Sequence, residues 1–188
     1  MARLKSDDKR SAILAAAIRV IGRQGLGAPT ALIAKEAGIA NGSLFTYFKT
    51  KAALLNQLYL EIKTEMGSAA LEGLPPEADL REQFLHGWAN WMRWTVRHPQ
   101  HRRVLAQLNA CADITEATRA SGHQAMARLA ALMELARAGG SMREAPFPFV
   151  VALMNSVAET TMDFMVHDPG NAEQHSKAGF DALWRMLS

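Results

Sequence analysis

The chain has 188 residues, of which 49% are hydrophobic and 21% are charged, and it contains one cysteine. This length suits one domain, or one large and one small domain, that buries roughly 70% of its unfolded surface. Cys111 alone cannot form an internal disulfide, which excludes a disulfide-stabilised secreted scaffold and favours the reducing cytoplasm. No uncharged apolar run approaches the roughly 18 residues of a membrane-spanning helix, so we expect no membrane contact.

The charge is unevenly distributed. Residues 1–60 contain nine Lys or Arg and three Asp or Glu, a net charge of +6. Residues 61–188 contain twelve basic and fifteen acidic residues, a net charge of −3. A basic N-terminal third on a mildly acidic body is expected of a protein whose N-terminal part binds a polyanion. The alternative is a chance clustering of solvated charges.

Apolar residues recur at helical spacing along nearly the whole chain, and no segment alternates long enough with a period of two to form a strand. The first helix has an apolar stripe formed by Ile13, Leu14, Ala17, Ile18 and Ile21. We expect Asp7 or Asp8 in its first turn and Gly25 at its end.

Two short helices follow. The first covers residues 30–37 and ends at Gly38, and the second runs to about residue 47, with Asn41 suited to cap its start. Thr50 and Lys51 begin a longer helix that ends before the GLPP sequence at 73–76, where two prolines forbid a helix interior. Later helices are predicted over 78–97, 100–110, 115–138, 147–167 and 171–187. The predicted fold is all-α with about nine helices.

Residues 30–48, TALIAKEAGIANGSLFTYF, have the layout of a helix-turn-helix, whose second helix enters the major groove of DNA. The positions expected to pack inward are Ile33, Ala34, Ala37, Ile39, Leu44 and Phe48. The positions left outward on the second helix are Asn41, Gly42, Ser43, Phe45, Thr46 and Tyr47. Short polar side chains and a bare glycine suit close approach to base edges and phosphates. The alternative is a tight corner between two helices, which also needs Ala and Gly here.

The stretch from Arg10 to Leu55 resembles the N-terminal domain of the TetR/AcrR family of bacterial transcriptional regulators. KRSAILAAAIRVIGRQG is similar to the first helix of that family, and IAKEAGIANGSLFTYFKTKAALL to its second to fourth helices. The resemblance implies a three-helix DNA-binding domain over residues 1–50. It also implies a larger helical domain for ligand binding and dimerisation over residues 51–188.

The resemblance also implies contacts with DNA. Thr30 would cap the second helix and touch a phosphate, and Tyr47 and Lys51 would each bind another phosphate. The residues that would face the major groove are Asn41, Gly42, Ser43 and Thr46. The chain departs from the family at Ala40, where Ser or Thr is usual, so that the cap is expected to move to Asn41. It departs again at Phe45, where the usual Tyr would offer a hydroxyl to a phosphate.

Apolar residues on the last two helices predict an interface with a second copy of the chain, in keeping with the family. The helix over 147–167 is apolar on two sides, so both sides need a cover. The residues assigned to the interface are Val157, Thr161, Phe164, Phe180, Leu183 and Trp184. The alternative is that these side chains pack within one chain.

Three tryptophans between residues 88 and 94 could line a pocket for an apolar or cationic small molecule. The residues assigned to that pocket are Trp88, Trp91, Met92, Met126 and Met133. The alternative is a core built of large side chains.

No motif indicates catalysis, a cofactor or a metal. There is no glycine-rich phosphate loop, nucleophile elbow or HExxH pair, and His98 and His101 lack the further ligands of a zinc site. Cys111 is read as a small apolar residue, with redox sensing as the alternative.

The sequence therefore predicts a cytoplasmic, homodimeric repressor that a small-molecule effector releases from a palindromic DNA operator. An activator, or a DNA-binding protein without an effector, would have the same residues. A helical ligand-binding module or enzyme whose N-terminal helices only pack is the alternative from another class.

Overall fold

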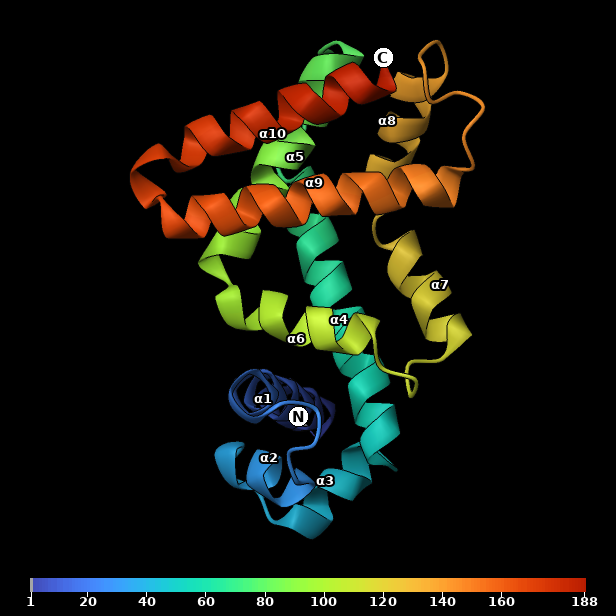
Figure 1. The fold of residues 1–188 in the computed structure, drawn as a ribbon. Helices are drawn as coiled ribbons and strands as arrows, with labels where there is room; N and C mark the ends of the chain where they lie inside the picture. The colour runs from blue at the N-terminus through green and yellow to red at the C-terminus, as the bar shows by residue number, and fades with distance from the viewer. Residues whose placement is uncertain (1) are drawn as a thin grey trace. The chain divides into compact units, whose positions relative to one another are not determined.

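Ten α-helices and one short 3-10 helix form the computed structural model, which describes the backbone of residues 2–188 and side chains from residue 7 onward (Figure 1). The helices are α1 (Ala2–Gln24), α2 (Thr30–Glu36), α3 (Asn41–Tyr47), α4 (Lys51–Leu71), α5 (Leu80–Arg97), α6 (Pro99–Asn109), α7 (Glu116–Gln124), α8 (Ala127–Arg137), α9 (Phe147–His167), the 3-10 helix η1 (Pro169–Asn171) and α10 (Ala172–Leu187). No strand occurs in residues 2–188, which confirms the all-α prediction.

The predicted helix over 115–138 is two helices, α7 and α8, so that the chain has ten α-helices rather than nine. The break falls at Ala125 and Met126. The backbone of Ala125 lies against Gly67 of α4, so closely that a Cβ on Gly67 would collide with the Ala125 carbonyl group. The break between α7 and α8 thus coincides with a close contact to α4, a helix distant in sequence. Residues 124–127 contain no proline or glycine from which the break could have been predicted.

The first helix begins earlier than the sequence predicted. It starts at Ala2, so Asp7 and Asp8 lie beyond its first turn, and no acidic residue occurs in that turn. The preceding residues include Ala, Arg, Leu and Lys, which are good helix formers, so nothing forces a start at the aspartates. The predicted end is confirmed, because Gly25 follows the helix with a positive φ of 80° and its N–H donates to the Ile21 carbonyl.

Contacts within the chain define two compact units. The N-terminal unit comprises residues 1–64 and 98–123, and the C-terminal unit comprises residues 65–97 and 124–188. The predicted domains, residues 1–50 for DNA binding and residues 51–188 for ligand binding and dimerisation, are defined by function and not by contacts. That division stays a prediction.

The core of the N-terminal unit is built from apolar stripes that the sequence predicted. On α1, all five residues of the predicted stripe are buried, and Ala16 and Val20 join them. On α4, the buried residues of this unit are Leu54, Leu55, Leu58, Tyr59 and Ile62. Burial of these faces is the main force that fixes α1 against its neighbours.

The C-terminal unit has an aromatic core between α5 and α10. Phe84 and Phe180 meet edge to face with their ring centroids 5.7 Å apart, and the Trp88 ring lies 6.4 Å from that of Phe180. Gly87 allows Leu129 of α8 to approach α5 more closely than a side chain would permit. In Figure 1, α9 and α10 lie side by side and run in opposite directions.

Candidate nucleic-acid interface

The turn between α2 and α3 is a Schellman motif. The Ile39 N–H donates to the Ala34 carbonyl at 3.0 Å, and the Gly38 N–H donates to the Lys35 carbonyl at 3.1 Å. This pattern needs a left-handed residue, which Gly38 supplies with a φ of +69°. The glycine that the sequence singled out therefore sets the angle at which α3 leaves α2.

Apolar side chains then fix the rotation of α3 about its axis. Ile33 and Ala34 of α2 are buried, and Leu44 and Phe48 of the following segment are buried with them. Ile39 is half-buried. Because these contacts hold one face of α3 inward, the opposite face is set outward.

The outward face of α3 consists of the residues that the sequence assigned to it. The exposed residues are Asn41, Gly42, Ser43, Phe45 and Thr46, while Tyr47 is half-buried. A Cβ added to Gly42 would find no atom within 4 Å, so this position is open surface. The face can donate and accept hydrogen bonds through an amide and two hydroxyl groups.

Two predicted caps are wrong. Ala40, not Asn41, occupies the cap position of α3, with an extended backbone and no side-chain cap bond, and Asn41 is the first helical residue. Likewise, Pro29 occupies the cap position of α2, and Thr30 is its first helical residue without a capping role. In both places the preceding residue adopts the extended backbone of a cap, so the polar residue moves into the helix.

Lys51, at the start of α4, has a partner that sequence reasoning missed. Its Nζ donates to the Ala28 carbonyl at 2.8 Å, in the loop between α1 and α2. Thr50 caps α4 by accepting the Ala53 N–H at 3.0 Å. The ammonium group thus holds the loop that leads into α2, and no motif in the sequence relates residues 28 and 51.

We expect Lys51→Met to lower the free energy of unfolding by about 1–2 kcal/mol, because a half-buried carbonyl loses a charged hydrogen-bond donor. Denaturant unfolding at constant protein concentration measures the change. Lys49→Met is the matched control, since Lys49 is an exposed lysine two residues away. Equal losses in the two variants would show that the bond to Ala28 contributes nothing.

An ion-pair cluster links α1 to the end of α2. Glu36 accepts a hydrogen bond from Arg19 Nε at 2.7 Å and another from Arg23 Nη2 at 3.0 Å. These two hydrogen bonds, Arg19 first, hold the pKa of Glu36 below its usual value. Two of the cations in the basic N-terminal third therefore have a structural partner.

The Glu36 cluster predicts a pH dependence of stability. A carboxyl group with a lowered pKa in the folded state stabilises above its unfolded pKa, and the stabilisation is lost as pH falls through the folded pKa. Glu36→Gln should therefore be less stable than the wild type at pH 7, and the difference should shrink as the pH is lowered from 7 towards 3. Thermal unfolding between these pH values tests this, with Glu77→Gln as a control for removing an exposed carboxylate. A difference that persists unchanged at acid pH would contradict it.

Helix α6 also holds the last turn of α1 and the loop that follows it. Gln107 Oε1 accepts the Leu26 N–H at 3.2 Å, and Arg103 Nη1 donates to the Gly22 carbonyl at 3.2 Å. Both α6 residues lie 81 positions from their partners, so only the tertiary structure reveals these contacts.

The predicted ligand-binding residues lie in the C-terminal unit, mostly within its core. Trp88, Trp91, Met92 and Met133 are buried, and Met126 is half-buried. The Trp88 indole N–H donates to the Ser176 carbonyl at 2.9 Å, and its ring meets the Trp91 ring edge to face. These contacts are those of a packed core, the alternative that the sequence left open.

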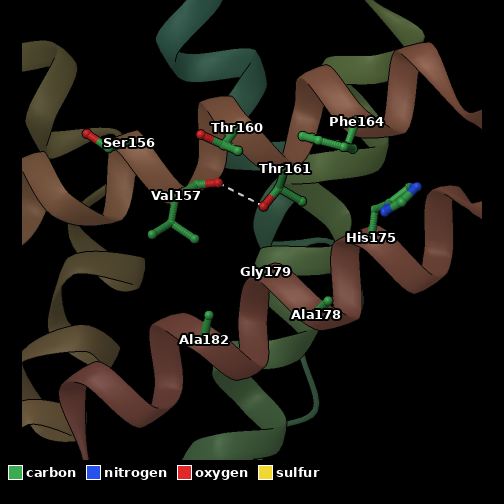
Figure 2. Close-up of a pocket in the computed structure, with 9 residues that line it drawn as sticks. All are labelled: Ser156, Val157, Thr160, Thr161, Phe164, His175, Ala178, Gly179 and Ala182. Atoms are coloured by element: carbon green, nitrogen blue, oxygen red, sulfur yellow. Dashed lines mark hydrogen bonds between the residues drawn. The ribbon is translucent and has the colours of Figure 1, made fainter.

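A groove lies along α9 and α10, where the interface with a second chain was predicted (Figure 2). The residues lining it are Ser156, Val157, Thr160, Thr161, Phe164, His175, Ala178, Gly179 and Ala182. The two helices approach closely here, because Gly179 leaves no room for a Cβ beside Thr161. The Phe164 side chain is 58% exposed.

The structure divides the predicted interface residues into two groups. Phe180 and Leu183 have no exposed surface and belong to the core of the C-terminal unit, so they offer no area to a second chain. Trp184 is half-buried and stacks on Phe180, with ring centroids 6.1 Å apart. Phe164 is exposed and Val157 is half-buried, whereas Thr161 lines the groove but is buried and donates its hydroxyl to the Val157 carbonyl.

By length and composition alone, α9 is apolar enough to cross a membrane, with a mean hydropathy of 1.3 in its most apolar stretch. Its exposed residues include Asn155, Glu159 and Asp163, however, which recur along its length. A lipid-facing helix would not repeat exposed charges in this way. The exposed apolar residues of α9 therefore suit contact with another protein surface better than contact with lipid.

The described residues contain no group of three or more His, Cys, Asp or Glu side chains that could hold a metal ion. His98 and His101 are in contact, with ring centroids 5.1 Å apart. Burial, and secondarily the neighbouring His98, lowers the pKa of His101. Cys111 is half-buried and is not in a disulfide.

Comparison with known proteins agrees with this geometry. Residues 13–58 match the family described as bacterial regulatory proteins, tetR family. A solved structure assigned to this family from Shewanella sp. PV-4 is 27% identical, with a TM-score of 0.84 over 94% of this chain and 96% of that chain. A TetR family transcription regulator from Marinobacter aquaeolei VT8 is 23% identical, with a TM-score of 0.85 over 98% of both chains. A third structure, from Vibrio parahaemolyticus, is 21% identical, with a TM-score of 0.76 over 95% and 98%.

A helix-turn-helix with an exposed second helix, in a larger all-α chain, is the architecture of a DNA-binding transcriptional regulator. The structural likeness extends over nearly the whole chain, well beyond the helix-turn-helix. Residues 13–58 match the TetR family of bacterial regulatory proteins, and over nearly its whole length the chain has the fold of solved TetR family transcription regulators.

Proposed function

We propose that this regulator is a cytoplasmic, homodimeric repressor that a small-molecule effector releases from a palindromic operator. The observation that carries the proposal is the outward face of α3, next to the Schellman motif at Gly38. Its exposed residues are small, polar or aromatic: Asn41, Gly42, Ser43, Phe45 and Thr46. In this proposal residues 1–50 bind DNA, and residues 51–188 bind the effector and the second subunit.

The proposed DNA contacts follow from chemistry and exposure. Asn41 can pair with an adenine edge, and Ser43 and Thr46 can reach bases or phosphates. The Tyr47 hydroxyl would bind a phosphate, as would the N–H groups of Lys51 that remain beside its bond to Ala28. Thr30, as the first residue of α2, would bring its hydroxyl to a phosphate without capping the helix.

A dimer is required because one half-site of DNA offers too few base contacts for useful specificity. The groove along α9 and α10 supports a symmetric interface in which each copy contributes the same surface. Val157, Thr161 and Phe164 would lie at its centre, with the half-buried Trp184 at its edge. Phe180 and Leu183 would support the interface from the core behind it.

The effector site is proposed near the aromatic cluster of the C-terminal unit. Trp88, Trp91 and Met92 on α5 and Met133 on α8 would line it, with Met126 at the start of α8. Since four of these five side chains are buried, an effector there would have to displace core contacts, and its binding would shift the population of conformers.

Selection of binding sites from a random duplex DNA library tests the proposal. A palindromic consensus is expected, followed by release from that site by members of a small-molecule library. Recovery of no specific sequence would contradict DNA-directed regulation. A specific site that promotes transcription when occupied would instead show an activator.

A further inference from the structure

The arrangement of residues around α3 indicates which base the outward face reads. Helical geometry sets successive residues about 100° apart, so Gly42 lies roughly 60° from Phe45 and roughly 40° from Thr46 around the axis. Leu44 lies roughly 200° from Gly42, on the inward side of the helix, and is buried. Gly42 therefore occupies the middle of the outward face, with an aromatic ring on one side and a side-chain methyl group on the other.

Phe45 is an unusual residue for this place. Its side chain is 40% exposed, although a phenylalanine contributes most to stability when it is buried. The neighbouring contacts of α3 leave it outward, since Leu44 fills the core position beside it. Along residues 7–64, Leu32 on α2, at 37%, is the other large apolar side chain with comparable exposure.

Gly42 makes the surface beside Phe45 accessible. Apart from the adjacent residues and the helix's own backbone, no atom lies within 4 Å of the position that a Cβ would take, so the backbone of α3 is bare there. A ligand group could thus reach the helix surface and contact the Phe45 ring edge and the Thr46 methyl group together. The result is a shallow apolar site set among Asn41, Ser43 and the Thr46 hydroxyl.

The net charge of +6 over residues 1–60 favours a polyanion as the occupant, and under the proposed function that polyanion is DNA. Among the base edges in the major groove, only thymine presents an apolar group, its C5-methyl, and phenylalanine and the threonine methyl group are suited to contact it. We infer that Phe45, with Gly42 and Thr46, is a specificity-determining residue that reads a thymine methyl group in each half-site. The inference rests on the proposed binding of DNA and adds the identity of a base.

Replacing single thymines of the selected operator by deoxyuridine removes only the methyl group and tests the inference directly. For the wild type, one thymine position in each half-site should show a loss of about 4-fold in affinity, and substitution in both half-sites about 15-fold. For Phe45→Ala, the same DNA substitution should change affinity by less than about 2-fold. Leu32→Ala, at a similarly exposed apolar residue, is the matched control and should keep the full methyl effect.

Gly42→Ala provides a second test, in which a loss of operator affinity cannot be attributed to a loss of folding. Alanine in place of a helical glycine should raise the free energy of unfolding slightly, since no atom obstructs its Cβ. The same Cβ should hold the base away from the helix, so operator affinity should fall by at least 10-fold and the methyl effect should disappear.

Specific operator binding without a methyl effect at any thymine, or an equal effect in the wild type and Phe45→Ala, would overturn the inference and leave the proposed function standing. Failure of the wild type to select any DNA sequence would overturn the proposed function and, with it, this inference.

Discussion

Phe164→Glu is expected to convert the proposed dimer into monomers. In a symmetric interface each substitution occurs twice, so two apolar contacts are lost and two charges are brought into a desolvated surface. The dimer dissociation constant should rise on the order of 1,000-fold, and operator affinity should fall with it, because each monomer reads a single half-site. Sedimentation velocity across a concentration series measures the first effect, and operator titration measures the second.

Val166→Glu is the matched control for this experiment. Val166 is on the same helix, is 50% exposed against 58% for Phe164, and lies roughly 200° further around the axis, away from the groove. The control should remain dimeric and bind the operator normally. Dissociation of both variants would indicate a general effect of charge on α9, and dissociation of neither would exclude the α9 and α10 groove as the interface.

Trp88→Ala is expected to lower the free energy of unfolding by about 3–5 kcal/mol, the range for removing a large buried aromatic side chain. The indole ring is 1% exposed, packs on the Phe180 and Trp91 rings, and donates its N–H to the Ser176 carbonyl. Trp88→Phe should cost less, about 1–2 kcal/mol, because the ring volume is largely kept while the hydrogen bond is lost. Chemical denaturation monitored by far-UV circular dichroism measures both changes.

Trp94→Phe is the control for these two variants, since Trp94 is half-buried on the same helix. The comparison separates a packed core from a preformed ligand pocket. If Trp88 lined an empty pocket, Trp88→Ala would leave stability nearly unchanged and would alter only effector binding. A loss below about 1 kcal/mol would therefore favour the pocket over the core.

The N-terminal unit was predictable from sequence to a large extent, because local signals and long-range packing agree there. The stripe on α1, Gly38 in the turn and the inward position of Leu44 all follow from helical periodicity and glycine conformation. The same rules predicted which residues of α3 point outward. They could not identify the caps, because Pro29 and Ala40 take those positions through backbone conformation rather than a side-chain hydrogen bond.

Features that depend on residues far apart in sequence were not predictable. The break between α7 and α8 coincides with a backbone contact at Gly67, and the pairing of Glu36 with Arg19 joins two helices. Similarly, an apolar stripe on α10 does not show whether a side chain faces its own chain or a second one. Burial resolves this for Phe180, which is wholly inside the C-terminal unit.

The partners of the basic side chains affect how DNA binding would respond to ionic strength. Each phosphate that a free cation neutralises releases counterions, which gives a slope of about −0.9 in a plot of log affinity against log salt concentration. Residues 1–60 contain nine basic residues, but Arg19 and Arg23 are paired with the carboxylate of Glu36. Cations already engaged in this way displace fewer ions on meeting a phosphate. Operator binding should therefore weaken with added salt less steeply than the number of basic residues suggests, leaving more of the affinity to contacts made by α3 with the bases.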